Sequence, residues 1–543
     1  MSSHLAASIS KKNRIGLLAL LGLWAGWVLL TLSTRPPLPI DETRYLSVAW
    51  QMLQRNDFWV PYLNDHPYSH KPPLLFWLIC IVWKFFGADG YCGRLVAPLF
   101  GLGNILLTTR FFRMLWPNSP HPSYFAGLCL ISFLPFQIYL PMTMFDNLVE
   151  FFTILGLIGI LEAWRGKSVL PWALTGASVT LGILAKGPVI LVFLIPVILL
   201  LPWINPSPRS KSRWYLSGIL TLTLGSALVL VWAIPAAIKG GPEYSKAIFL
   251  TQTAGRLVHA FDHAHPFWWY LALSPVILFP WFFWIPAWRS FAQLPRQMDF
   301  GSRFCLIWIV PAFVILSLIS GKQIHYLAPM FPAIALLATH TLLNLGNVQR
   351  RGSQKSIAIT FMVLGGLIIL LYNLLGWKVK QIGLPPDTQF LGVLVILTGV
   401  ALFFTQFKNM VQSIHIISLA SLALMVFTHL ISIDFIKDRY DLRPISEKIK
   451  QFQMEGKTVA YFTRYSGEFN YLGRLEKTIH RIRGKKLQPW PTQNPKDVVI
   501  VRCRVPLSIF SESPQFWQKF KKDIYAIWSS KSIVADPTIG AKC

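Results

Sequence analysis

The chain has 543 residues, of which 53% are hydrophobic and only 14% are charged. Because soluble domains carry about 25% charged residues, this composition excludes a soluble fold for most of the chain and indicates that lipid is its main solvent. The formal net charge of +28 does not indicate a nucleic-acid partner, because most basic residues of the apolar part stand at alternate ends of hydrophobic runs, where they orient membrane helices.

The first apolar run, 15–32, follows the basic residues Lys11, Lys12 and Arg14. Secretory signal peptides begin in the same way. This run is longer than a typical signal core, and no clear small-residue cleavage site follows it. We therefore expect an uncleaved first span with the N-terminus in the cytoplasm.

Apolar runs of spanning length then recur as far as Asp434. Placing the basic clusters on the cytoplasmic side predicts an α-helical polytopic membrane protein with about thirteen spans of about 20 residues. The expected spans are 15–33, 94–115, 121–140, 147–164, 169–185, 188–204, 214–238, 267–288, 303–320, 327–346, 356–376, 389–406 and 412–433. Lys378 and Lys380 run against this rule, which leaves the last three spans open to other arrangements.

Two further helices are expected to lie flat in the outer interface, near 42–53 and 73–87. The first stretch is amphipathic, which is typical of interfacial helices. The second, Leu74 to Phe86, is apolar but short for a span and follows two prolines. If it crossed the membrane, every later loop would change sides, so we exclude it from the spans.

After Asp434 the sequence changes to ordinary polarity, with β-like runs at 458–463 and 497–501. We expect a transmembrane catalytic domain at 1–434 and a small, soluble, extracytoplasmic α/β domain at 435–543. The basic surplus of this tail could meet anionic headgroups or a phosphorylated lipid. Cys503 and Cys543 could pair if the tail is extracytoplasmic, although nothing in the sequence requires it.

This topology gathers ionisable and polar residues from distant loops on the outer side of the membrane. Such residues at a membrane boundary cost free energy unless they are paired or hydrated, so they are functional candidates by default. The alternative for each residue alone is an interfacial anchor or half of a helix-packing ion pair. The set comprises Asp41, Glu42, Arg44, His66, His70, Lys71, Asp146, Lys186, Arg256, His259, Asp262, His263, His265, Lys322, His325 and Tyr326.

The chemistry that this set favours is group transfer from an anionic lipid carrier. Asp41 could take the proton from an acceptor nucleophile. Lys71, Lys186, Arg256 and Lys322 could bind a phosphate and offset the charge that develops as it leaves. Arg44 could do the same or pair with Asp41.

Several short motifs occur in a fixed order along the chain. They are Asp41-Glu42-Thr43-Arg44-Tyr45, Asn64, Lys71-Pro72-Pro73 with Phe76-Trp77, Asp146, Ala185-Lys186-Gly187-Pro188, Pro266-Phe267-Trp268-Trp269-Tyr270, and the stretch from Lys322 to Pro329. Together they resemble the membrane glycosyltransferases that use polyprenyl-phosphate sugars. That family contains the aminoarabinose transferases acting on lipid A and is related to the protein O-mannosyltransferases. The resemblance covers essentially the whole membrane part.

The resemblance implies a GT-C fold, a catalytic cavity at the outer face of the inner membrane, and inverting transfer from a polyprenyl phosphate to a lipid, glycan or protein acceptor. Asp41 matches the essential acid of the first outer loop, and Asp146 and Glu42 are further catalytic candidates. Arg44, Lys71, Lys186 and Tyr326 match residues around the donor phosphate. Arg256 and Lys322 complete the candidate substrate-binding set.

The chain departs from the aminoarabinose transferases at positions associated with a metal. His70 replaces a glutamate before Lys71-Pro72-Pro73, and Gln252 and Thr253 replace a Glu-His pair. Imidazole is a common metal ligand, so His70 and His263 could hold a divalent cation, but no cofactor is certain. The sugar, the acceptor, the oligomeric state and the role of the tail stay open.

A transporter or flippase of a lipid-linked substrate is the alternative function. Transporters are typically built from repeats with matching broken helices in two halves, and we find no such repeat in this sequence. A third alternative is a membrane anchor that displays the basic tail, but such an anchor would not need the ionisable residues gathered on the outer side.

The topology predicts which cysteines a membrane-impermeant thiol reagent reaches from outside the cell. Ser466→Cys in the tail should be labelled, and Ser210→Cys in an inner loop should be protected until the membrane is permeabilised. The opposite pattern would contradict the topology and, with it, an outer-face site.

Overall fold

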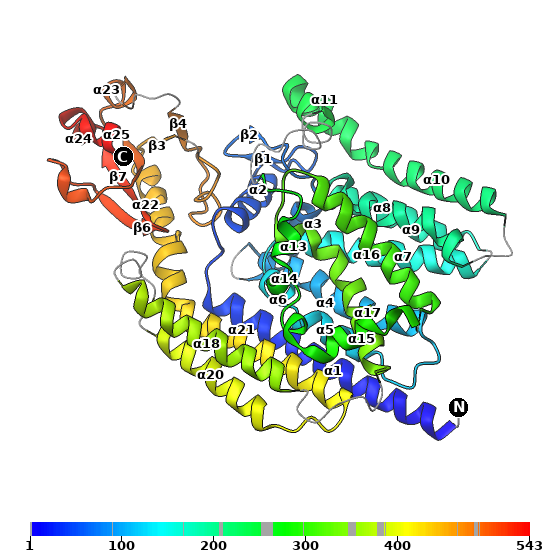
Figure 1. Ribbon diagram of the computed structural model, residues 1–543. Coiled ribbons are helices and arrows are strands. Elements are labelled where there is room, and N and C mark those ends of the chain that lie inside the picture. Colours follow the sequence, from blue (N-terminus) through cyan, green and yellow to red (C-terminus); the bar gives the residue numbers. More distant parts are fainter. Residues whose placement is uncertain are drawn as a thin grey trace.

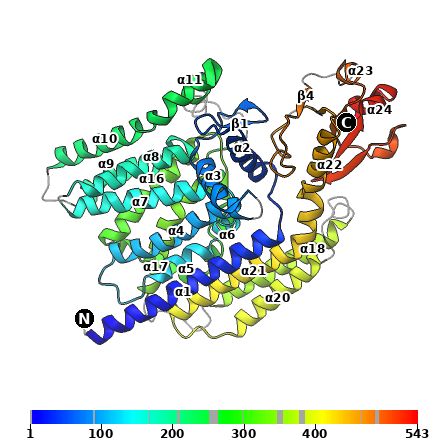
Figure 2. The same cartoon turned by 180° about the vertical axis from the view of Figure 1, so that it is seen from behind.

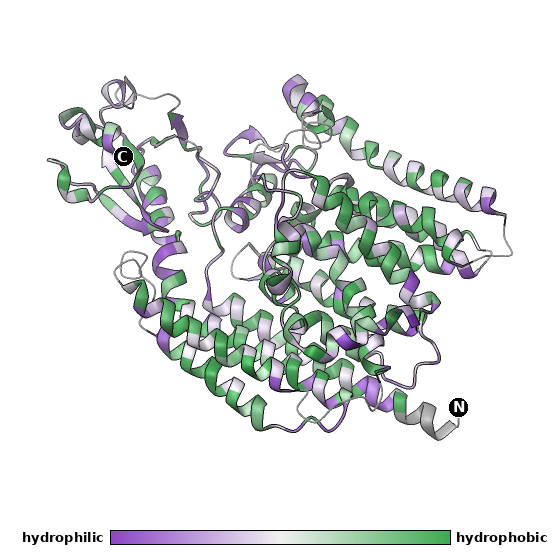
Figure 3. Ribbon diagram, viewed as in Figure 1, coloured by the Kyte–Doolittle hydropathy of each residue, from purple (hydrophilic) through white to green (hydrophobic). Residues whose placement is uncertain are grey.

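The computed structural model describes all residues except 1–2, 89–90, 167, 206–209, 251–263, 297, 346–353, 377–384, 386, 464, 483–486 and 488. Most of these residues form a helical bundle, beside which a small mixed α/β unit stands at the C-terminal end (Figure 1). Figure 3 shows the apolar residues concentrated on the bundle helices and the polar ones in loops and in the C-terminal unit.

Among the described residues, eight helical segments are long and apolar enough to cross a membrane. Five lie within single helices: α1 (Ser3–Thr34), α4 (Cys92–Leu115), α7 (Asp146–Arg165), α16 (Phe300–Leu318) and α18 (Lys355–Leu374). The other three each join two elements: α10 (Lys211–Ala227) with α11 (Leu230–Lys246), the 3-10 helix η5 (Ile324–Met330) with α17 (Phe331–Leu343), and α21 (Met410–Tyr440) with α22 (Arg443–Met454). The multi-pass helical architecture is therefore confirmed.

Shorter helices fill the rest of the bundle. They are α3 (Leu74–Phe86), α8 (Leu170–Lys186), η1 (Pro188–Ile190) with α9 (Leu191–Ile204), and α20 (Thr388–Phe404). Helix α8 packs between α7 and α10, and α18 packs against α20. Because these helices are at most 17 residues long, length alone does not establish how many of them cross the membrane.

Two stretches expected to be continuous spans, 121–140 and 267–288, are broken into short pieces. The first forms α5 (Tyr124–Ser132) and α6 (Leu134–Tyr139), separated by Phe133 in an extended conformation just before Pro135. The second forms α13 (Trp269–Ala272), α14 (Ser274–Ile277), η3 (Trp281–Phe283) and α15 (Ile285–Ala292). Proline lacks the N–H that continues a helix, and Pro275, Pro280 and Pro286 punctuate this second stretch.

Helices form in both stretches expected at the outer interface, as α2 (Asp41–Arg55) and α3. Helix α2 packs against α3, and a two-stranded hairpin of β1 (Tyr62–Leu63) and β2 (His66–Pro67) connects them. Gly87, with φ +81°, ends α3 in a backbone conformation that favours glycine. Helix α2, the hairpin and α3 thus form one compact segment between α1 and α4, residues 41–87, which we call the outer segment after its expected position.

The C-terminal unit begins with α22 (Arg443–Met454), which follows the end of α21. Its sheet has the strand order β4-β3-β5-β7-β6. The strands are β3 (Val459–Phe462), β4 (His480–Ile482), β5 (Val498–Cys503), β6 (Phe516–Phe520) and β7 (Asp523–Ser529). Strand β3 pairs in parallel with β4 and β5, whereas β7 pairs antiparallel with β5 and β6. The short helices α23 (Pro489–Gln493), α24 (Ser530–Ala535) and α25 (Thr538–Lys542) complete the unit.

Hydrogen bonds attach the C-terminal unit to the outer segment. Ser47 of α2 donates to the carbonyl of Gly467 at 2.7 Å. The side chain of Asn64 makes two bonds with the backbone of Ile479, at 2.8 and 2.9 Å. In two opposite views the unit stands at the same end of the molecule as α2 and β1 (Figures 1 and 2).

Candidate functional site

A cavity of about 470 Å³ lies where α2 begins, between the outer segment and the bundle. Its walls come from five distant parts of the chain. The described lining residues are Leu38, Pro39, Ile40, Asp41, Glu42, Tyr139, Met142, Met144, His265, Trp269, Lys322, Gln323, Ile324, His325 and Tyr440. The fold thus brings five residues of the sequence-based set, namely Asp41, Glu42, His265, Lys322 and His325, to one hollow.

Asp41 is the first residue of α2 and presents its carboxylate to the cavity. Its side chain is 54% exposed and forms an ion pair with Arg44, one helical turn later. The hydroxyl of Tyr45 donates to the same carboxylate oxygen at 3.3 Å. An acidic residue in the first turn of a helix also interacts favourably with the helix dipole. The carboxylate is therefore oriented by its neighbours and still accessible.

Glu42, the next residue, also lines the cavity, but its side chain is only 1% exposed. Arg35 forms an ion pair with its carboxylate, and the backbone N–H groups of Leu38 and Thr143 donate to it at 2.9 and 2.8 Å. Burial raises the pKa of the Glu42 carboxyl, but the charges of Arg35 and Arg94 outweigh this effect, and the pKa falls to about 2. Glu42 therefore has a permanently charged, fully occupied carboxylate that ties α2 to the segment before α7.

Asp146 begins α7 and forms a second buried ion pair. Its carboxylate accepts from the ammonium of Lys186 at 2.5 Å, and the two side chains are 5% and 12% exposed. Lys186 is the last residue of α8, which Gly187 ends with φ +84°. The Lys186 ammonium also lies 4.7 Å from the ring centre of Tyr326. Three of the sequence-predicted residues are thus in direct contact.

Two further predicted cations, Lys71 and Lys322, belong to the described residues. The ammonium of Lys71 lies 5.9 Å from the ring centre of Phe145, the residue before Asp146. Lys322 donates to the carbonyls of His265 and Ile319 at 2.9 and 2.5 Å. An ammonium has three donors, so Lys322 keeps one for a ligand in the cavity.

No group of three or more His, Cys, Asp or Glu side chains that could hold a metal ion occurs among the described residues. The ring of His70 lies 5.1 Å from that of Tyr68, as a tilted aromatic pair. The other proposed ligand, His263, lies outside the described residues, as do Arg256, His259 and Asp262. The described side chains therefore do not fit a metal site, and we derive no step through a metal.

Three residues near the site were missed by sequence reasoning. Glu150 is fully buried one turn after Asp146 on α7, and its position inside an apolar span could have marked it. Tyr440 closes the cavity from the end of α21. Lys521, in the turn between β6 and β7, lies with its ammonium 6.0 Å from the Tyr440 ring centre. No local pattern connects Lys521 with Asp41, because 480 positions separate them in the chain.

Comparisons with known proteins agree with this geometry. Residues 70–237 match the family described as dolichyl-phosphate-mannose-protein mannosyltransferase. The chain is 27% identical over 411 residues to the undecaprenyl phosphate-alpha-4-amino-4-deoxy-L-arabinose arabinosyl transferase 2 of Pseudomonas fluorescens strain Pf0-1, covering 74% of this chain and 72% of the relative. It is 30% identical over 343 residues to the corresponding transferase 1 of another strain of that species, but the match spans only 62% of this chain and 60% of the relative.

The fold also resembles a solved structure. The crystal structure of ArnT from Cupriavidus metallidurans bound to undecaprenyl phosphate superposes with a TM-score of 0.72 at 17% identity, over 94% of this chain and 97% of that one. The apo structure of the same protein gives a TM-score of 0.73. These likenesses confirm the GT-C type of fold that the ordered motifs predicted.

The two neighbouring acids of α2 should respond differently to loss of charge. Glu42→Gln leaves Arg35 buried without its counter-charge, which typically costs about 3–5 kcal/mol. We expect a large fall in the thermal unfolding temperature of the purified protein. Asp65→Asn breaks the half-exposed Arg55–Asp65 pair and is the matched control, since such pairs contribute about 0–1 kcal/mol. A Glu42→Gln protein as stable as the parent would contradict the structural role.

Proposed function

Because this chain belongs to the family of membrane glycosyltransferases that use polyprenyl-phosphate sugars, we propose that it is an inverting enzyme that transfers a sugar from a polyprenyl phosphate to an acceptor at the outer membrane face. The acceptor is a lipid, a glycan or a protein. The named relatives are undecaprenyl phosphate-dependent arabinosyl transferases, which makes undecaprenyl phosphate the carrier to test first.

The accessible carboxylate of Asp41 is the observation that carries the proposal. Of the three acidic candidates, Glu42 is buried against Arg35 and Asp146 against Lys186, whereas Asp41 is half exposed at the cavity. A general base must reach the proton that it removes. Asp41 therefore takes the catalytic role, and Asp146 and Glu42 hold charged side chains and backbone in position.

In the proposed reaction, an acceptor hydroxyl attacks the anomeric carbon from the face opposite the phosphate. Asp41 accepts the hydroxyl proton as the new C–O bond forms. The bond between the anomeric carbon and the phosphate oxygen breaks at the same time, and its electron pair stays on the polyprenyl phosphate. We assign Arg44, Lys71 and Lys322 to offset that charge, as fixed donors do in other enzymes.

Lys186 and Tyr326 form the proposed floor of the phosphate site. The ion pair with Asp146 and the aromatic face of Tyr326 hold the Lys186 ammonium in one place. A positioned cation binds an anion with little loss of side-chain entropy, which is the benefit of preorganisation. Arg256 stays in the proposed substrate-binding set on sequence grounds.

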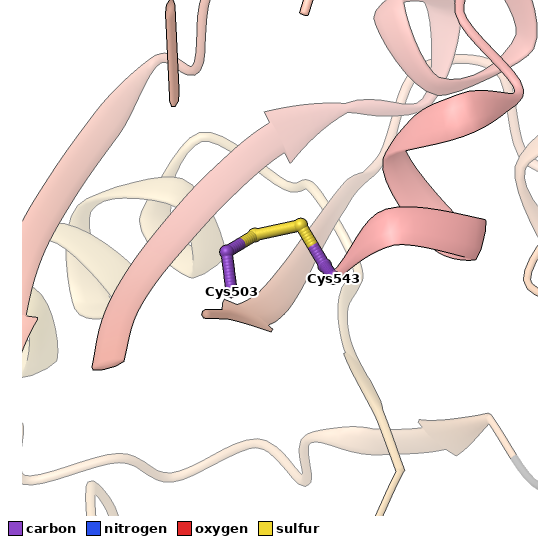
Figure 4. The surroundings of a disulfide bond; sticks show 2 residues. All are labelled: Cys503 and Cys543. Carbon is purple, nitrogen blue, oxygen red and sulfur yellow. A yellow bond between two sulfur atoms is a disulfide. The ribbon is translucent and has the colours of Figure 1, made fainter. Parts of the chain in front are cut away.

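We further propose that the N-terminus is cytoplasmic, that the chain crosses the membrane about thirteen times, and that 435–543 forms an extracytoplasmic domain. The disulfide between Cys503 and Cys543 (Figure 4) supports an outer location, since disulfides persist in oxidising compartments. It links the end of β5 to the last residue of the chain.

Asp41→Asn tests the catalytic assignment directly. The amide keeps the size of the side chain but cannot accept the proton, so turnover should fall by about 10² to 10⁴. Binding of undecaprenyl phosphate, measured by native mass spectrometry, should be unchanged. Asp65→Asn is the control, because it also loses an arginine-paired carboxylate of the outer segment. Near-parental turnover of a stable Asp41→Asn protein would exclude Asp41 as the base.

Lys521 connects the C-terminal domain to the same cavity. The backbone N–H of Lys521 donates to the carbonyl of Arg439 at 2.9 Å, and the guanidinium of Arg439 donates to the carbonyl of Lys521 at 2.7 Å. Both bonds fix the β6–β7 turn beside Tyr440. The Lys521 ammonium lies 6.0 Å from the ring centre of Tyr440, which lines the cavity. We propose that Lys521 positions an anionic group of the acceptor at the cavity entrance.

Lys521→Gly separates this role from a structural one. Lys521 has φ +53°, a conformation that glycine adopts without steric cost, so the variant should be at least as stable as the parent. The acceptor KM should rise about tenfold or more, since a hydrogen bond to a charged group contributes about 1.5–3 kcal/mol. Lys522→Ala, which changes the exposed neighbour, is the control. A weaker undecaprenyl phosphate affinity would instead assign Lys521 to the donor.

A further inference from the structure

A second cavity lies at the opposite end of the bundle from the α2 site and shares no lining residue with it. It has a volume of about 610 Å³ and lies between α1 and α21, with α5 as its floor. Helices α1 and α21 run side by side in both views (Figures 1 and 2). Nothing in the proposed transfer reaction uses this cavity.

The walls of this cavity are apolar along most of its length. Ile15, Ala19 and Leu23 contribute from α1, Leu128 from α5 and Leu419 from α21. From Lys12 to Leu23 the lining extends about 16 Å along α1, at about 1.5 Å per residue. That is close to half of the roughly 30 Å hydrocarbon thickness of a bilayer. The groove therefore has the length of one acyl chain in one leaflet.

Small residues on α1 keep the groove open. A Cβ atom at Gly16 would lie 2.2 Å from the ring of Tyr124, so glycine lets that ring pack against the helix. A Cβ atom at Gly22, farther along the groove, would meet no atom within 4 Å. Close packing closes such gaps in most protein interiors, whereas here Ala19, Leu20, Gly22 and Leu23 all line the cavity.

The end of the groove near the N-terminus is polar and carries positive charge. Lys12 lines it and is exposed, and Lys11 and Arg14 lie on the same turns of α1. The described lining contains no aspartate or glutamate. Burial lowers the pKa of His121, which favours its neutral form. Lys12 therefore supplies the charge of the lining at this end, and this positive charge complements an anion.

The other polar groups at this end are already satisfied by each other. The hydroxyl of Tyr124 lies 2.8 Å from Nε2 of His415. Nδ1 of His415 lies 2.9 Å from the carbonyl of Val411 and must donate to it. Nε2 then accepts from the tyrosine. This pair forms a fixed wall and leaves Lys12 as the contact for a headgroup.

We propose that this groove binds one anionic phospholipid, with an acyl chain between α1 and α21 and the headgroup phosphate beside Lys12. In the proposed orientation this lipid belongs to the cytoplasmic leaflet, where anionic headgroups attract basic segments that flank membrane helices. The lipid completes the packing of α1 against α21. The proposal does not depend on the transfer reaction.

Native mass spectrometry of delipidated protein tests the site, with phosphatidylglycerol and phosphatidylethanolamine added separately as probes. The parent should retain phosphatidylglycerol preferentially. Gly22→Leu should lose it, because the new side chain fills the groove. Gly26→Leu is the matched control: a Cβ at Gly26 also meets no atom within 4 Å, but Gly26 does not line the cavity. Ala19→Leu is a second filling variant, in case Gly22→Leu does not fold.

The charge of the site is tested in the same way. Lys12→Gln should abolish the preference for phosphatidylglycerol, whereas Lys11→Gln, outside the lining, should leave it intact. Equal retention of both lipids by the parent would overturn the anionic assignment. Retention of phosphatidylglycerol by both filling variants, or occupation of the groove by a polyprenyl chain or by a second protein, would overturn the phospholipid site.

Discussion

The buried ion pair between Arg35 and Glu42 holds together the elements on which the α2 site depends. Arg35 follows the last turn of α1, and Glu42 lies in the first turn of α2. Arg35 also donates to the carbonyl of Pro141, and Arg94 at the start of α4 donates to the carbonyl of Arg35. One charged pair thus joins α1, α2, α4 and the segment before α7. Because Glu42 is fixed, its neighbour Asp41 is directed to the cavity.

Ion pairing also explains why the site can carry several charges at a small cost in free energy. An unpaired charge at a membrane boundary is expensive, and two of the buried acids here have basic partners. Glu42 is paired with Arg35, and Asp146 with Lys186. These pairs hold backbone and side chains in place, which leaves the exposed carboxylate of Asp41 and the one remaining donor of Lys322 accessible from the cavity. Rigid surroundings and an accessible carboxylate are what the proposed preorganised site requires.

Hydropathy and charge alternation were sufficient to predict the polytopic helical fold, and the ordered motifs predicted the GT-C type. The breaks near Phe133 and Pro280 were not predicted, because prolines are common in membrane helices and only packing decides whether a helix ends there. Sequence also could not separate Asp41 from Glu42. Their difference depends on Arg35, Thr143 and Arg94, which approach from other elements. Lys521 was missed for the same reason, since its contact with the site is entirely tertiary.

The hydrogen bonds from Ser47 and Asn64 to Gly467 and Ile479 have a consequence for biosynthesis. Segments that bond to each other are separated by more than 400 positions, and Tyr440 supplies part of the cavity wall. A ribosome-bound chain would therefore have its first acidic loop in place long before the walls that surround it. The cavity wall is completed only when Tyr440, at the end of α21, has been synthesised. A partly synthesised chain therefore has the carboxylate of Asp41 but not the cavity that encloses it.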